Sequence, residues 1–299
     1  MALQSHLISA PGLPFSVEYA MSAVFSYAMN SHAFFATAPK GMDSLLVEEL
    51  RAFGADEPVA RGAGVSFRAP LDVAYRACLW SRVANRVLLP LAEFPALDAD
   101  RLYQGIGAIP WEEHLAPEGT LAVDFVGSSP SINHTRYGAL RVKDAIVDRF
   151  RERCGLRPSV DTQRPDLRVN VHLRRERASV YLDLSGESLH RRGYREHGTQ
   201  APLKENLAAA ILMRAAWPML AEEGGALVDL MCGSGTLPIE GALMAGDIAP
   251  GLLRTHYGFL GWRQHEAGVW QALLAEARER REAGKARIPP IRAYDADPR

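Results

Sequence analysis

The spacing of apolar positions first predicts a small α+β unit. Strand-like apolar runs lie at 33–37, 64–68 and 86–91. Between them, a stretch that ends at Gly54 and a stretch at 71–81 carry apolar residues at helical spacing. Strand, helix, strand, helix and strand in this order predict a ferredoxin-like unit over 33–90. Residues 1–32 show no clean period and predict a loose extension, in which Met29 is a candidate natural start.

A second α+β unit is predicted over 91–186. Its expected elements are a strand at 120–126, a helix at 137–150 and two alternating strands at 167–173 and 179–184. The last two strands are spaced to pair as a hairpin around Arg174, Arg175 and Arg177. The turn Ser185-Gly186-Glu187 then closes the unit.

The third segment, 187–299, changes to the pattern of a parallel α/β sheet. An apolar helix is expected at 203–216, followed by a short strand at 226–230, a glycine-rich turn and a helix at 236–245. A second short strand at 291–294 leads into Asp295-Ala296-Asp297. Strand, glycine turn and helix open a parallel sheet. Because such a sheet needs several strands and the pattern supplies two, we expect an incomplete α/β Rossmann-like domain.

Composition excludes several classes of protein. With 299 residues, 47% of them hydrophobic and 23% charged, the chain is an ordinary globular one, and it has no run of 18 apolar residues that would span a membrane. The first basic residue is Lys40, which argues against a secretory signal. The three cysteines and nine histidines lack the spacings of a disulfide scaffold or a metal site. We therefore expect a cytoplasmic protein without a metal.

The charge is unevenly distributed along the chain. The net charge is −1, but residues 133–195 hold 15 Lys and Arg against 8 Asp and Glu. A basic segment in a neutral chain is typical of a protein with an anionic partner such as a nucleic acid. The alternative is a solvated surface rich in arginine, since 30 of the 34 basic residues are Arg.

The sharpest motif is the glycine turn that follows the strand at 226–230. It runs Asp229-Leu230-Met231-Cys232-Gly233-Ser234-Gly235-Thr236-Leu237-Pro238-Ile239-Glu240. Glycines let the backbone turn tightly and approach a ligand closely. Pro238 stands where a dinucleotide fingerprint has its third glycine, and no P-loop lysine follows, so both of those nucleotide motifs are disfavoured. Taken alone, Gly233 and Gly235 are also compatible with a plain strand-to-helix turn.

Read as a whole, the turn closely resembles the S-adenosylmethionine motif of RNA-modifying methyltransferases with an N-terminal THUMP domain. Other stretches resemble one subfamily, the bacterial 23S rRNA guanine-N2 methyltransferases of the RlmL type. These stretches are Phe35-Ala36-Thr37-Ala38-Pro39-Lys40-Gly41, Trp80-Ser81-Arg82, the helix 137–148, Asp183-Leu184-Ser185-Gly186, Leu189-His190-Arg191-Arg192-Gly193-Tyr194-Arg195, Ala201-Pro202-Leu203-Lys204-Glu205 and Gly258-Phe259-Leu260-Gly261-Trp262. The resemblance covers about residues 30–299. It implies a ferredoxin-like unit, a THUMP domain and part of a class I methyltransferase domain.

The resemblance implies roles for individual residues. A wall around the methionine part of S-adenosylmethionine would be formed by Asp229, Gly233, Ser234, Gly235 and Thr236. Asp295 would accept hydrogen bonds from the ribose hydroxyls, with Asp297 as the weaker candidate and a solvated carboxylate as the alternative. Lys204 and Glu205 would add a further wall, which is a weaker transfer from the family.

For RNA phosphates, the candidates are Arg141, Lys143, Arg174, Arg175 and Arg177. Arg191, Arg192 and Arg195 lie in the linker before the methyltransferase segment, where they would touch RNA or bridge the domains. The expected partner is 23S rRNA or its assembly precursor.

Two departures from the family pattern matter. Leu230 stands where the family usually has proline, a mild change. The family's Asn-Pro-Pro-aromatic motif, which aligns the target amine, does not occur in the 299 residues. No catalytic residue can therefore be named, and we expect the chain to be inactive alone. Two rival hypotheses stay open: an RNA-binding THUMP protein with a non-functional methyltransferase remnant, and a methyltransferase for DNA or protein amines.

Overall fold

The computed structural model describes residues 31–195 and 203–296. Met29, Asp297, and nearly all of the predicted extension 1–32 lie outside the described residues, as do Ala201 and Pro202. No helix in the described ranges is both long and apolar enough to cross a membrane.

The first unit has the predicted strands and helices and one further strand. Its elements are β1 (His32–Thr37), α2 (Asp43–Ala52), β2 (Asp56–Ala60), β3 (Gly64–Ala69), α3 (Leu71–Trp80) and β4 (Arg86–Pro95). Strand β1 pairs antiparallel with both β3 and β4. The unpredicted strand β2 pairs with β3 at the edge of the sheet. The order β-α-β-β-α-β is that of a ferredoxin-like unit.

The second unit contains the predicted hairpin. Its elements are α4 (Ala99–Ala108), the 3₁₀ turn η1 (Trp111–Glu113), β5 (Thr120–Gly127), α5 (Thr135–Cys154), β6 (Ser159–Val160), β7 (Leu167–Arg174) and β8 (Arg177–Asp183). Strands β7 and β8 pair antiparallel, and β5 runs parallel to β7. The hairpin turn is the pair Arg175 and Glu176, with φ of 49° and 58°. Two successive left-handed residues are what a tight two-residue hairpin turn requires.

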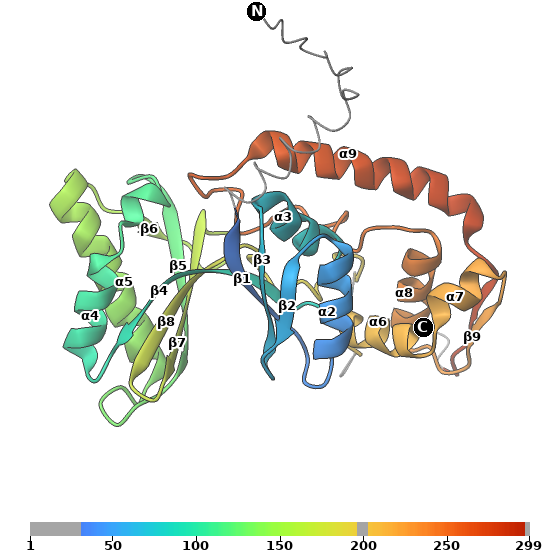
Figure 1. Cartoon of the computed structure of the whole chain (residues 1–299), viewed down its shortest axis with the longest axis horizontal. Coiled ribbons are helices and arrows are strands. Elements are labelled where there is room, and N and C mark those ends of the chain that lie inside the picture. The colour runs from blue at the N-terminus through green and yellow to red at the C-terminus, as the bar shows by residue number, and fades with distance from the viewer. Residues whose placement is uncertain (1–30, 196–202, 297–299) are drawn as a thin grey trace, which may run out of the picture.

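The two N-terminal units share one sheet. Its strand order is β2-β3-β1-β4-β8-β7-β5-β6 (Figure 1). The joining pair is β4 with β8, which extends from Leu88 opposite Asp183 to Pro95 opposite Arg177. Strand β4 therefore continues through residue 90, where the sequence analysis places a domain boundary. Most of the buried apolar side chains of both units belong to one cluster.

The third segment holds a short parallel sheet. Its elements are α6 (Glu205–Arg214), α7 (Trp217–Glu222), β9 (Leu227–Asp229), α8 (Thr236–Ala245), α9 (Ala267–Gly284), the 3₁₀ turn η2 (Lys285–Arg287) and β10 (Ile291–Ala293). Strands β9 and β10 pair in parallel, as the α/β pattern predicts. A separate small cluster around Leu212, Trp217 and Ala221 packs against Leu227 and Ile291 of the two strands.

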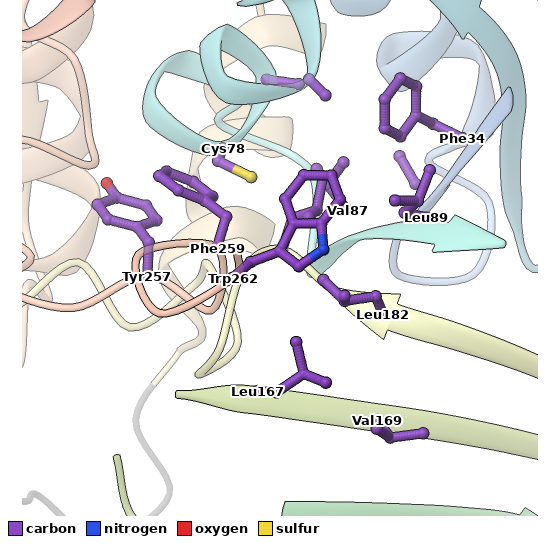
Figure 2. Close-up of a cluster of buried hydrophobic side chains, with 14 of the residues drawn as sticks. Phe34, Cys78, Val87, Leu89, Leu167, Val169, Leu182, Tyr257, Phe259 and Trp262 are labelled. Carbon is purple, nitrogen blue, oxygen red and sulfur yellow. The ribbon is translucent and has the colours of Figure 1, made fainter. Parts of the chain in front are cut away.

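The stretch between α8 and β10 packs on the N-terminal units. Tyr257, Phe259 and Trp262 are buried, and Figure 2 shows them beside Cys78 of α3 and Val87 of β4. The long helix α9 then runs along one side of the molecule (Figure 1), where Trp270 packs edge-on against Tyr75. Trp262 and Trp270 are thus core residues. This stretch holds the methyltransferase segment against the ferredoxin-like unit.

Candidate functional site

The glycine turn lies at the carboxyl end of the parallel pair β9 and β10. Gly233 and Gly235 have φ of 51° and 73°, in the left-handed region that favours glycine. The Gly233 N–H donates to Asp295 Oδ2 at 2.8 Å, and the Gly235 N–H donates to the Cys232 carbonyl at 2.8 Å. The turn residues at 229–236 and Asp295, which lies 62 positions after Gly233, thus meet in one place. Ligands of open α/β sheets bind at this end of the strands.

Backbone hydrogen bonds fix the two acidic residues beside the turn. The Tyr294 N–H donates to the Asp229 carbonyl at 2.8 Å, and the Cys232 N–H donates to the Tyr294 carbonyl at 2.9 Å. Asp229 Oδ1 accepts from the Met231 N–H at 3.1 Å. Each carboxylate is therefore held at the end of its own strand.

The turn leaves room for a ligand. Among the described residues, no atom lies within 4 Å of where a Cβ on Gly233 would be. Open space beside a backbone turn, flanked by two carboxylates that can accept hydrogen bonds from hydroxyl or ammonium groups, fits a cofactor of the S-adenosylmethionine type.

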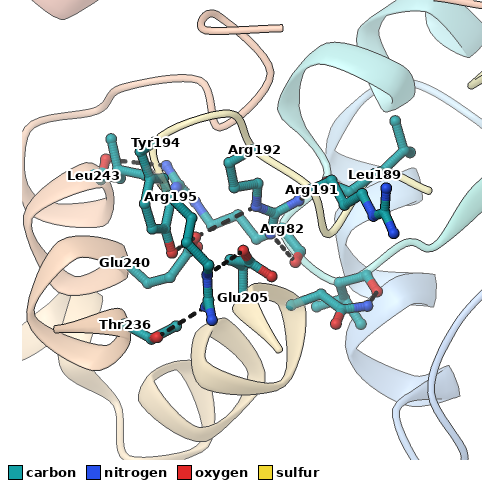
Figure 3. Close-up of polar contacts among 12 residues, drawn as sticks. Arg82, Leu189, Arg191, Arg192, Tyr194, Arg195, Glu205, Thr236, Glu240 and Leu243 are labelled. Carbon is teal, nitrogen blue, oxygen red and sulfur yellow. Dashed lines mark hydrogen bonds and ion pairs between the residues drawn. The ribbon is translucent and has the colours of Figure 1, made fainter. Parts of the chain in front are cut away.

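The linker before the methyltransferase segment reaches this turn (Figure 3). Arg195 donates from Nη2 to Thr236 Oγ1 at 3.1 Å and pairs through Nε with Glu205 Oε1 at 3.3 Å. Thr236 is buried and lies within 3.3 Å of Ser234 through their hydroxyl oxygens. Lys204 is the N-cap residue of α6, and its carbonyl accepts from the Leu207 and Ala208 N–H groups. Arg195 and Glu205, which precede the turn in the sequence, thus support it at Thr236. Asp295, which follows the turn, supports it at Gly233.

A buried ion pair joins the linker to helix α8. Arg192 and Glu240 are 1% and 0% exposed, and Arg192 Nε lies 3.4 Å from Glu240 Oε1. Arg192 also donates to the carbonyls of Leu189 and Arg82. The Tyr194 hydroxyl donates to the same Glu240 oxygen at 3.1 Å, and burial raises the pKa of this phenol.

Sequence reasoning left two roles open for the linker arginines. The structure shows that Arg192 and Arg195 bridge to the methyltransferase segment, whereas Arg191 is exposed. Glu240 and Tyr194 were part of the quoted motifs but were given no role. Their partners come from distant parts of the chain, and no local pattern announces such contacts.

The five predicted RNA contacts lie in the second unit. Arg141 forms an ion pair with Asp100 at 2.7 Å and lies over the Tyr103 ring at 4.3 Å. Lys143 pairs with Asp144, and Arg177 pairs with Glu93 at 2.7 Å. The exposed residues Arg174 and Arg175 lie at the tip of the β7–β8 hairpin.

Contacts bring this hairpin tip and helix α5 to the same end of the unit. The Ala96 N–H donates to the Glu176 carbonyl at 2.7 Å, and Arg141 Nε donates to the nearby Ala99 carbonyl at 3.3 Å. Arg141 and the hairpin arginines therefore flank the start of α4. Binding of RNA by these residues stays a prediction.

Comparisons with known proteins now identify the family. Three family models match in succession: an RlmL ferredoxin-like domain at 33–88, a THUMP domain at 96–183 and an RMKL-like methyltransferase domain at 192–299. The ribosomal RNA large subunit methyltransferase K/L of Syntrophotalea carbinolica is 61% identical over 88% of this chain. That of Methylococcus capsulatus is 57% identical over 89% of this chain.

A solved structure from Listeria monocytogenes, described as a predicted N6-adenine-specific DNA methylase, is similar to this chain. It is 30% identical with a TM-score of 0.77, over 90% of this chain and 69% of that one. The chain belongs to the RlmL-type THUMP methyltransferases.

This family membership confirms the predicted fold class of ferredoxin-like, THUMP and methyltransferase units. A second solved structure, SMU.472, is described as a putative methyltransferase complexed with SAH; it is 28% identical, with a TM-score of 0.75 over 90% of this chain and 69% of that one. The chain spans 37% and 36% of the length of the Syntrophotalea and Methylococcus relatives.

Proposed function

We propose that this chain binds S-adenosylmethionine and 23S rRNA for methylation of the exocyclic N2 amine of a guanine, in the cytoplasm. The observation that carries the proposal is the glycine turn joined to Asp295 at the strand ends, in the same chain as a THUMP domain. Support comes from relatives named rRNA large subunit methyltransferases and from the neighbour complexed with SAH.

The cofactor would supply a methyl group on a sulfonium, and the chain's task would be to position it. Gly233, Ser234, Gly235 and Thr236 would lie along the methionine part, with Asp229 at the end of β9. Asp295, placed beside the turn by the Gly233 N–H, would accept hydrogen bonds from the ribose hydroxyls. Buried Thr236, held by Arg195, would keep this wall in place.

The RNA would be bound by the THUMP unit, with phosphate contacts from Arg141, Lys143, Arg174, Arg175 and Arg177. We propose that residues 33–90, 91–186 and 187–299 act as the ferredoxin-like, THUMP and methyltransferase units. Alignment of the amine would require the family's Asn-Pro-Pro-aromatic motif, which the 299 residues do not contain. The chain would then bind both ligands without transferring a methyl group.

Calorimetric titration of the full chain with SAH tests the cofactor site. We expect binding that Asp295→Asn weakens by at least about tenfold, because a hydrogen bond to a charged group contributes about 1.5–3 kcal/mol. Asp56→Asn, the same change at an exposed residue of β2, is the matched control and should leave the affinity unchanged.

Failure of the chain to bind SAH would instead support an RNA-binding protein with a methyltransferase remnant. Competition between 23S rRNA and DNA of equal length tests the other rival, since preference for DNA would overturn the RNA assignment.

A further inference from the structure

A basic cleft of about 720 Å³ lies between the THUMP unit and the methyltransferase segment. Its walls are the loop between β6 and β7, the linker after β8 and the loop that precedes α9. The lining residues that carry charge or can titrate are Arg164, Arg168, Glu187, Arg191, Arg254 and His256. No residue of the glycine turn and none of the five predicted RNA contacts lines it.

Two of the arginines build the walls of this cleft. Arg254 donates to the backbone carbonyls of Ser185, Glu187, Ser188 and Arg191, at 2.7–3.1 Å. Arg168 donates to Asp124 and, at 2.8 Å, to the Thr162 carbonyl. These contacts hold the linker and the β6–β7 loop in place around a fixed positive charge.

The other two arginines are available for a ligand. Arg164 is exposed, and its guanidinium makes no hydrogen bond or ion pair with any residue in the described ranges. Arg191 is exposed and reaches only Glu187, at 3.3 Å, within the same ranges. A planar guanidinium matches two oxygens of a phosphate, which makes arginine well suited to bind this group.

Polar atoms around the cleft are buried without partners. His256 Nε2, Arg168 Nε and Arg254 Nε have no hydrogen-bond partner among the described residues. Buried polar atoms in native proteins are almost always hydrogen-bonded, so these three nitrogens of cleft-lining side chains are exceptions. Burial and the charges of Arg164, Arg254 and Arg168 lower the pKa of His256, while Asp166 raises it. A bound anion would offset this excess of positive charge.

We propose that the cleft binds a phosphodiester group of the RNA, with Arg164 and Arg191 as its direct ligands. This inference rests on the proposed function, because it assumes that RNA is bound. It adds a phosphate site that the linker connects to the cofactor turn: Arg191 lines the cleft, its neighbour Arg192 is buried against Glu240 of α8, and Arg195 holds Thr236. A phosphate bound here would fix the position of the RNA strand relative to the methyltransferase segment.

Filter binding of an in vitro transcript of 23S rRNA to the full chain, over a range of salt concentrations, tests this proposal. We expect Arg164→Gln to weaken binding several-fold and to reduce the slope of log K against log salt by about 0.7–0.9, the value for one phosphate contact. Arg278→Gln is the matched control, because Arg278 is an exposed arginine on α9 outside the cleft. Arg164 has no protein partner to lose, so the variant should fold normally, which circular dichroism verifies.

The outcomes separate this site from the proposed function. Equal RNA binding by wild type, Arg164→Gln and Arg278→Gln would overturn the cleft and leave the rRNA assignment intact. Absence of RNA binding by the wild type would overturn both. As a second measurement, NMR titration of His256 with inorganic phosphate should raise its pKa in the wild type and less in Arg164→Gln. A phosphate response with unchanged RNA binding would mean a site for small anions, and would also overturn the proposal.

Discussion

Two adjacent arginines of the linker, Arg191 and Arg192, differ sharply in environment. Arg192 is buried against Glu240, whereas Arg191 forms an exposed pair with Glu187. Loss of one partner of a buried ion pair leaves an uncompensated charge and costs about 3–5 kcal/mol, whereas an exposed pair contributes about 0–1 kcal/mol. We therefore expect Arg192→Met to lower the free energy of unfolding by about 3 kcal/mol, and Arg191→Met to change it by less than about 1 kcal/mol. Urea denaturation measures both.

The double variant Arg192→Met/Glu240→Met provides the control. Apolar side chains of similar volume need no partner, so the double variant should be more stable than Arg192→Met alone. Equal stability of the two would argue against an energetic coupling between Arg192 and Glu240.

At the residue scale, the glycine turn was predictable because its signal is local. Gly233 and Gly235 follow an apolar run directly, and the chain pattern alone places them at the end of a strand. The burial of Arg192 was not predictable, because its partners Arg82 and Glu240 lie 110 and 48 positions away. A charged residue between another arginine and a glycine indicates a surface position in any local pattern.

Between elements, an ion pair joins η1 to α5. Arg149 donates from Nε and Nη2 to the two carboxylate oxygens of Glu112, at 2.8 and 2.6 Å. These hydrogen bonds lower the pKa of Glu112 from 4.5 to about 2. A carboxyl whose pKa is lower in the folded than in the unfolded chain stabilises the fold above its unfolded pKa, and this contribution is lost as the pH falls through the folded value.

We therefore expect Glu112→Gln to be less stable than the wild type at neutral pH, by about 1 kcal/mol for a partly exposed pair. The difference should shrink as the pH falls from 4.5 to about 2. Urea denaturation of both proteins across this range gives the difference directly. A constant difference at every pH would show that the effect of the substitution does not come from the ion pair.

Arg280 holds helix α9 against Trp80 and Asp247. Its guanidinium lies 3.8 Å from the Trp80 ring centroid and donates to both carboxylate oxygens of Asp247, at 2.8 and 2.9 Å. Together these contacts stabilise the docked helix by about 1–2 kcal/mol. Arg280→Gln should therefore speed amide hydrogen exchange around Leu273 and Ala277 about tenfold. The exposed Arg278→Gln on the same helix should leave the exchange unchanged, and equal effects of the two would contradict this role of Arg280.

At the element scale, the sequence analysis did not predict β2, α4 and α9. Strand β2 is the charged, proline-containing sequence 56–60, which forms a strand only because β3 offers it hydrogen bonds. Helix α4 has ten residues, like the predicted α2 and α3, and it has a local signal, since Asp98 caps its start and Leu102 and Ile106 lie four positions apart. Helix α9 likewise buries Trp270, Leu273 and Ala277 at helical spacing. Local spacing therefore indicates these two helices, whereas tertiary contacts decide β2.

The whole molecule divides differently from its sequence units. Pairing of β4 with β8 makes one sheet from the ferredoxin-like and THUMP units. The loop and helix at 247–290, to which the sequence analysis assigned no role, contribute Trp262 and Trp270 to the same core. Helices α6 and α7 and the two parallel strands instead surround a separate small cluster. Local periodicity found each segment but carries no information on which segments share a core.

The five tryptophans report on this division, because they are placed in different clusters. Trp80, Trp111, Trp262 and Trp270 belong to the large core, and Trp217 belongs to the small one. The small cluster buries few side chains, and Val228, Leu230 and Met231 beside it are 53%, 72% and 87% exposed. Since regions with few buried apolar contacts open at the lowest free energy, we expect Trp217 to unfold before the others.

Fluorine NMR of the full chain labelled with 5-fluorotryptophan resolves the five residues during urea denaturation, with assignment by single Trp→Phe variants. We expect Trp80 and Trp111 to unfold at one midpoint, since the β4–β8 pair lies between the units that contain them. Trp262 and Trp270 should unfold at the same midpoint, and Trp217 should unfold at a lower urea concentration. Separate midpoints for Trp80 and Trp111 would show that the shared sheet does not couple the two units, and a single midpoint for all five would show that the small cluster is as stable as the large core.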